Sequence, residues 1–111
     1  MSIEADTIAR IDATLLPQLD RHHLRLLAHC LASFRDMSPD VDGALPNAAL
    51  RRKWCEQQPV VADDPKFLTL LLDQLNNAAQ QLEEVADTCN KAPLELSLDD
   101  LIAAAERRCR S

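Results

Sequence analysis

The amino-acid sequence predicts an all-α protein, built as a compact bundle of four to five helices. Leucine and alanine dominate its apolar residues, and both rank high among helix formers. The chain lacks tyrosine and contains one glycine, whereas sheet proteins use aromatic residues in strands and glycine in turns. Apolar residues also recur at steps of three and four positions, which places them on one face of a helix. The length of 111 residues suits a single helical domain, residues 1–111.

Residues 1–16 are predicted to form a peripheral N-terminal arm or helix. The candidate helix runs from Ile3 to Leu15, with Ser2 as its N-cap, and its apolar residues are sparse. It therefore packs on its own subunit, frays, or lies against a neighbouring subunit.

A second helix is predicted from Pro17, which suits a first turn, to Met37. Most of its apolar residues are spaced by three or four positions. They define one face, which comprises Leu16, Leu19, His23, Leu26, Leu27, Cys30, Phe34 and Met37. We expect this face to be buried.

A loop that contains proline and glycine, Ser38–Leu45, separates this helix from a third helix predicted over Pro46–Gln57. The third helix is expected to bury Leu50 and Trp54, which lie one turn apart. It should end before Pro59, because the residue that precedes a proline disfavours helical geometry.

The strongest helical pattern follows Asp64, the predicted N-cap, and Pro65, the predicted first helical position. Its apolar residues alternate steps of three and four, as in a heptad repeat. They are Leu68, Leu71, Leu75, Ala78, Leu82, Val85 and Cys89. We expect this helix to form the spine of the fold and to pack antiparallel to the second helix.

The C-terminal part is predicted to form one more helix. Leucines alternate with polar residues over residues 94–98, which indicates a short extended segment. Ser97 and Asp100 then have the spacing of a capping box at the start of a helix over Leu98–Arg108.

The charge of the chain excludes several classes of partner. A formal net charge of −6 argues against binding to nucleic acid, which requires a basic surface. No apolar run approaches the roughly 18 residues of a membrane span, and Met1–Arg10 lacks the apolar core of a signal peptide. We therefore expect a cytoplasmic protein with no membrane partner.

No familiar catalytic motif is present. The sequence lacks a P-loop, a dinucleotide fingerprint, GxSxG and HExxH. The four cysteines, Cys30, Cys55, Cys89 and Cys109, contain no CxxC pair, and cysteines on apolar helical faces are mostly small core residues. We therefore expect no catalytic residue, no metal and no cofactor.

One alternative is a metal- or thiol-dependent site around His23 and Cys30. Thiol and imidazole groups can bind zinc or form a nucleophile and base pair. Seven residues of helix, however, separate the two Cα atoms by about 10 Å. The spacing favours a hydrogen-bonded histidine beside a core cysteine.

A second alternative is a nucleic-acid adaptor that uses Arg51, Arg52, Lys53 and Trp54. Basic residues beside an aromatic ring can bind nucleic acid by charge and stacking. A single short cluster on an acidic chain favours instead a buried or interfacial tryptophan with solvated neighbours.

The run Trp54–Pro59, followed by Asp63–Phe67, resembles short helical proteins of cyanobacteria to which no activity is assigned. The resemblance covers the chain from Leu24 onward and implies no site residue.

Our leading hypothesis is a non-catalytic protein–protein interaction or assembly module, acting as a homodimer or with another protein. Phe67 and Leu70 lie outside the main apolar stripe of their helix, so the chain carries more apolar surface than one core needs. Together with Trp54, they are the predicted interface residues.

Overall fold

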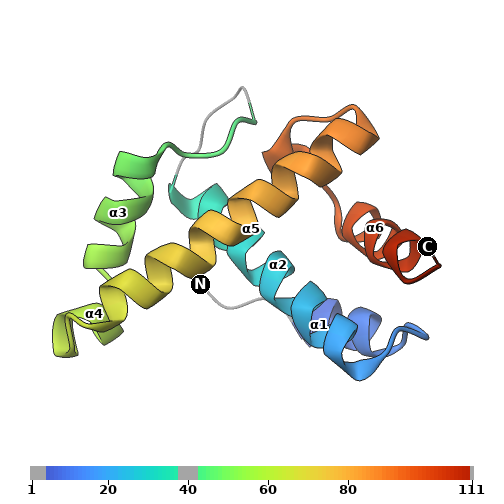
Figure 1. Cartoon of the computed structure of the whole chain (residues 1–111), viewed down its shortest axis with the longest axis horizontal. Helices are drawn as coiled ribbons and strands as arrows, with labels where there is room; N and C mark the ends of the chain where they lie inside the picture. The colour runs from blue at the N-terminus through green and yellow to red at the C-terminus, as the bar shows by residue number, and fades with distance from the viewer. Residues whose placement is uncertain (1–4, 38–42, 111) are drawn as a thin grey trace.

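The all-α prediction is confirmed. The computed structural model describes residues 5–37 and 43–110, and over these ranges it contains six α-helices, one short 3-10 helix and no strand (Figure 1). The elements are α1 (Ala5–Asp12), α2 (Gln18–Met37), α3 (Ala48–Glu56), α4 (Pro59–Asp63), α5 (Phe67–Cys89), η1 (Pro93–Glu95) and α6 (Leu98–Arg110). The predicted cap Ser2 and most of the predicted loop Ser38–Leu45 lie outside the described residues.

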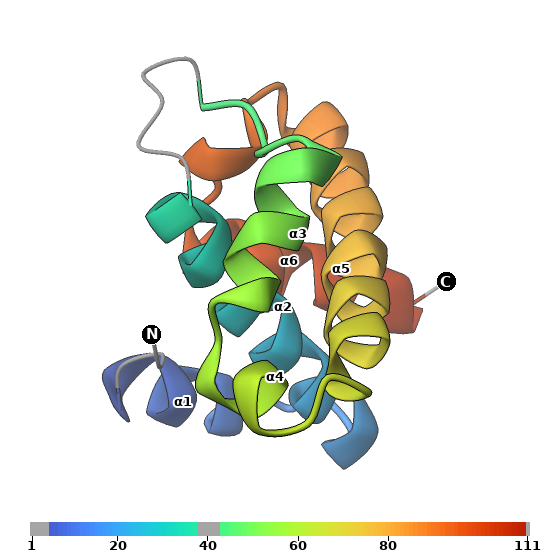
Figure 2. The ribbon, with the colours of Figure 1, turned by 90° about the vertical axis from the view of Figure 1, so that its left-hand side faces the viewer.

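Helix α2 occupies the centre of the fold and makes its most extensive contacts with α5 and α6. Figure 1 shows that the axes of α5 and α2 cross near the middle of the two helices, and Figure 2 shows α3 alongside α5. The predicted antiparallel packing of these two long helices is therefore wrong. Because they cross, α5 reaches α3 at one end of the molecule while α2 reaches α6 at the other.

The apolar stripe predicted for α5 forms its core-facing side, as expected. Leu75, Ala78 and Leu82 are buried, and the other members of the stripe are half-buried against the same core. Ala79 and Ala86 widen the buried face and allow neighbouring helices to approach closely. The polar residues on the opposite side of α5 are exposed.

The buried face of α2 differs from the predicted one. Leu19 and Leu26 were expected in the core but are 78% and 36% exposed, whereas Leu24 and Leu31 are 1% and 3% exposed. The helix packs against α5 and α6 together, so its buried face centres on Leu24, Leu27 and Leu31. The predicted stripe follows only one edge of this wider face.

Helix α1 packs on its own chain through Ile11, which is fully buried. Its Arg10 forms an ion pair with Asp99 of α6, and Asp12 accepts a hydrogen bond from Arg25 of α2 at 3.3 Å. These pairs are exposed, so each adds little stability, and the apolar contact of Ile11 is the main attachment.

The connection from α3 to α5 contains a helix that the sequence analysis missed. Pro59 ends the preceding segment, as predicted, but it also occupies the first turn of α4, where a proline costs no hydrogen bond. The predicted cap is also wrong: Asp64 Oδ1 accepts from the Lys66 backbone N–H at 3.1 Å, which forms a turn, and α5 begins at Phe67.

Gly43 holds the end of the first long connection against η1. Its φ of +73° favours glycine, and a Cβ there would lie 2.8 Å from the Ala92 Cβ. The Gly43 carbonyl accepts from the Leu94 N–H at 2.8 Å. A side chain at this position would therefore strain the backbone and displace η1.

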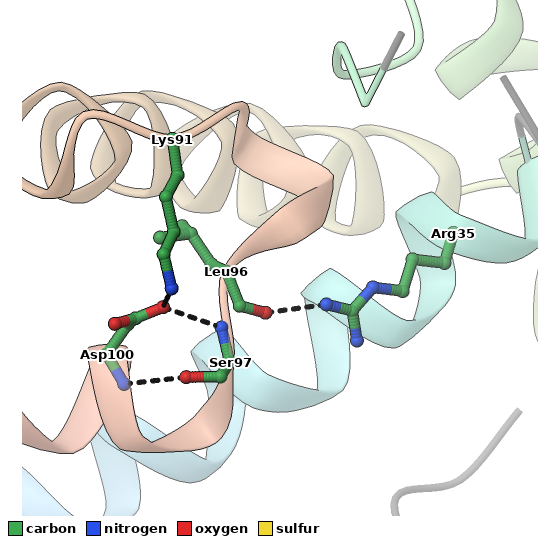
Figure 3. A network of polar contacts seen from close by, with 5 residues as sticks. All are labelled: Arg35, Lys91, Leu96, Ser97 and Asp100. Atoms are coloured by element: carbon green, nitrogen blue, oxygen red, sulfur yellow. Dashed lines mark hydrogen bonds and ion pairs between the residues drawn. The ribbon is translucent and has the colours of Figure 1, made fainter. Parts of the chain in front are cut away.

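A polar network fixes the segment between α5 and α6 (Figure 3). Arg35 of α2 donates to the carbonyl oxygens of Leu94 and Leu96 at 3.0 and 2.6 Å. The predicted capping box is confirmed, because the Asp100 N–H donates to Ser97 Oγ at 3.1 Å and the Ser97 N–H donates to Asp100 Oδ2 at 2.9 Å. The predicted extended segment is partly wrong, since residues 93–95 form η1.

We expect Asp100 to make stability depend on pH in acid. A hydrogen bond from Lys91 at 2.7 Å, and a second from the Ser97 N–H, lower the pKa of Asp100 to about 2 from its ordinary value of 3.8. Between these values the unfolded chain binds more protons, so the stabilisation is present above about pH 4 and is lost toward pH 2. Urea unfolding at several pH values between 4 and 2 should show that the free energy of unfolding falls less steeply with decreasing pH in Asp100→Asn than in the wild type.

Lys91→Met should reproduce most of that change, because the Lys91 hydrogen bond is the largest cause of the shift. Stability curves of the wild type and Asp100→Asn that run parallel between pH 4 and pH 2 would contradict this assignment.

No helix in the part of the chain that the structure describes has the length and apolarity needed to cross a membrane.

Candidate functional site

His23 and Cys30 line one half-open cavity between α2 and α5. Its volume is about 190 Å³. The lining residues from α2 are His23, Leu26, Leu27 and Cys30, and those from α5 are Gln74, Asn77, Ala78 and Gln81. The two residues that the sequence analysis paired therefore do share a site.

The contacts of the pair are those of a structural histidine and a core cysteine. His23 Nε2 lies 2.6 Å from Gln81 Oε1, and because an amide oxygen only accepts, the ring donates from Nε2. Burial raises the pKa of the Cys30 thiol to about 11, so the thiol is protonated at neutral pH, whereas metal binding and nucleophilic attack use the thiolate. The metal- or thiol-dependent site therefore stays a prediction, and the protonated state of Cys30 does not support it.

The remaining cysteines divide into buried and accessible ones. Cys55 is fully buried and Cys89 is half-buried, as expected for core residues. Cys109 is exposed, which contradicts the predicted burial, because it lies in the last turn of α6 beyond the core. Within residues 5–37 and 43–110, no three His, Cys, Asp or Glu side chains form a cluster that could hold a metal ion.

Two of the three predicted interface residues lie together on the surface. Phe67 and Leu70 are 43% and 64% exposed and lie one turn apart at the start of α5. Trp54 is half-buried and packs against the core from α3. Trp54 is therefore less exposed than the pair of apolar residues on α5.

The basic cluster of α3 is dispersed. Arg52 is exposed and lies 3.9 Å from Glu56, one turn further along the helix. Arg51 is half-buried, and its Nε is buried without a hydrogen-bond partner among the described residues. Trp54 is half-buried and packs against the core. The nucleic-acid adaptor stays a prediction that no contact in the structure favours.

The structure adds exposed apolar residues that the sequence analysis placed in the core. Leu50 of α3, which was expected to be buried, is 40% exposed. On α2, Leu19 is exposed in the first turn and Leu26 is exposed beside the cavity. A shift of the buried face of α2 toward Leu24 and Leu31 leaves these leucines outside. The only sequence signal was that α2 carries more leucines than one face can hold.

Leu19 and Leu26 of α2, with Phe67 and Leu70 of α5, are hereafter called the α2/α5 apolar surface. All four are exposed, Leu26 lines the cavity, and Leu70 lies one turn before the cavity residue Gln74. The cavity therefore adjoins exposed apolar side chains on both helices. Such an arrangement is a candidate binding surface.

A family model described as the NDH complex assembly factor CRR9 matches residues 3–111. Comparison with curated proteins and with solved structures found no match. The matched residues include the region from Leu24 onward that resembles small cyanobacterial proteins. The chain thus belongs to the family of the NDH complex assembly factor CRR9.

Proposed function

We propose that this protein is a non-catalytic assembly factor that binds a protein subunit or assembly intermediate of the NDH complex. The NDH complex is proposed as the target because the description of the matching family names it. The observation that carries the mode of action is the α2/α5 apolar surface, whose four large side chains stay exposed although the chain has a packed core.

The energetics favour a protein partner for this surface. Burial of a leucine or phenylalanine side chain contributes about 1.5–3 kcal/mol when it is complete. Four partly exposed side chains therefore offer several kcal/mol to a partner that covers them. An assembly factor has to release its client, and an apolar surface of only four large side chains fits reversible binding.

Self-association is the alternative use of the same surface, since it would join two copies of this chain into the predicted homodimer. Sedimentation of the purified protein at micromolar concentration separates the two cases. A monomer that still co-purifies with NDH subunits assigns the surface to the client, whereas a dimer that loses NDH subunits assigns it to self-association.

Leu70→Asp is expected to weaken co-purification of NDH subunits about tenfold or more, the size of one interface hot spot. The change places a charge where the client must remove water, and it leaves the core untouched because Leu70 is 64% exposed. The measurement is quantitative mass spectrometry of subunits retained by the tagged protein, expressed at native levels.

Thr69→Asp is the matched control, since it adds the same charge to the neighbouring exposed position of α5. Its co-purification should equal that of the wild type. If both variants lose NDH subunits equally, a general charge effect explains the loss and the surface assignment is wrong. If the wild type retains no NDH subunit, the proposed function itself fails.

A further inference from the structure

The cavity between α2 and α5 has the size of one side chain. Pockets for cofactors and drug-sized ligands measure about 300–1,000 Å³, and an apolar cavity of about 150 Å³ accommodates benzene. The volume of about 190 Å³ therefore suits one phenylalanine ring or one branched or thioether side chain. The size excludes most cofactors and favours an anchor residue from another protein.

The lining of the cavity selects an uncharged anchor. No Asp, Glu, Lys or Arg lines it, although these residues make up 27% of the chain. Its inner part is formed by Leu27, Cys30 and Ala78, which are all buried. A charged side chain inserted here would lose its water and find no carboxylate, ammonium or guanidinium group to pair with, at a large cost in free energy.

Two carboxamides at the cavity have unused hydrogen-bonding groups. Gln74 and Asn77 lie three residues apart on α5, and both side chains are exposed. Within the described residues neither side chain has a hydrogen-bond partner, in contrast to Gln81, which accepts from His23. A primary carboxamide offers donors and an acceptor together, the combination that matches the N–H and C=O of a peptide group.

We propose that this cavity is the docking site for a protein segment of the client, which inserts one large uncharged side chain between α2 and α5. The anchor is a leucine, methionine or phenylalanine, and the backbone beside it forms hydrogen bonds with Gln74 and Asn77. The exposed Leu26 and Leu70 flank the anchor and contact its neighbours. This inference rests on the proposed function and adds the site and chemistry of the client to it.

The test uses the purified full-length chain and overlapping short peptides that cover the subunits of the NDH complex. Bound peptides should share a leucine, methionine or phenylalanine, and replacement of that residue by lysine should abolish binding. Asn77→Arg should weaken the binding of these peptides about tenfold or more, because it places an unpaired charge at the cavity. The same variant should lose NDH subunits in co-purification.

Asn76→Arg is the matched control. Asn76 is an exposed asparagine of α5 that does not line the cavity, and arginine at either position is compatible with an exposed helical site. Its binding should equal that of the wild type, and circular dichroism should show the same helicity for both variants.

The inference is overturned if bound peptides select a charged anchor, or if Asn77→Arg and Asn76→Arg bind peptides and NDH subunits equally well. It is also overturned if no peptide binds and Asn77→Arg retains NDH subunits like the wild type. In these cases continued co-purification by the wild type leaves the proposed function intact. Loss of NDH subunits from the wild type would remove the proposed function instead.

Discussion

Phe34→Ala is expected to lower the free energy of unfolding by about 3–5 kcal/mol, the cost of removing a buried phenylalanine from a core. Phe34 lies in α2 with no exposed surface and belongs to the core cluster of the molecule. Its removal leaves a cavity that the crossing helices can only partly fill. Since domains of this size are stable by about 5–15 kcal/mol, the variant should be close to unfolding, which urea denaturation would measure.

Phe67→Ala provides the control, because Phe67 is the other phenylalanine of the chain and is 43% exposed. It should change the unfolding free energy far less than Phe34→Ala and weaken client binding. Equal losses of stability for the two variants would show that Phe67 is a core residue and would remove it from the α2/α5 apolar surface.

Arg35→Ala is expected to cost about 2 kcal/mol of stability, in the range for hydrogen bonds that involve a charged group. The guanidinium joins α2 to the segment before α6 through the carbonyl oxygens of Leu94 and Leu96. Figure 3 shows the hydrogen bond to Leu96. Leu96 is fully buried, so loss of its hydrogen bond leaves an oxygen with restricted access to water. Urea unfolding and hydrogen exchange of residues 94–97 would measure the effect.

Arg52→Ala is the matched control for that change. Arg52 is exposed and has a long 3.9 Å contact with Glu56, so its removal should cost less than about 0.5 kcal/mol. If Arg35→Ala is as mild as Arg52→Ala, the hydrogen bonds to Leu94 and Leu96 do not hold the segment.

The elements that sequence predicted best are those with a strong local signal. The heptad spacing from Leu68 to Cys89 determined α5, and the pairing of Ser97 with Asp100 identified the capping box. Both depend on residues within a few turns of one another, so they do not require knowledge of the fold.

The wrong structural predictions concern features that tertiary packing determines. Two overlapping apolar faces exist on α2, and only its simultaneous contact with α5 and α6 selects the face with Leu24 and Leu31. Helix α4 is a single short element whose stability comes from its neighbours, so Pro59 was interpreted only as a helix stop. The crossing of α2 and α5 also depends on contacts that no local pattern contains.

The candidate site was predictable in part. Leu70 and Phe67 were identified because they fall outside the apolar stripe of α5, and His23 with Cys30 because of their spacing. Gln74 and Asn77 gave no signal, since amide residues on a helix ordinarily face solvent. Their place beside a cavity follows from the packing of α5 across α2.

The most direct test of the central claim is the amount of assembled NDH complex in native-host cells that lack this protein. Native gels should show a marked loss of the complex, restored by the wild type and by Thr69→Asp but not by Leu70→Asp. Normal levels of assembled complex in the deletion strain would contradict an assembly role for this protein.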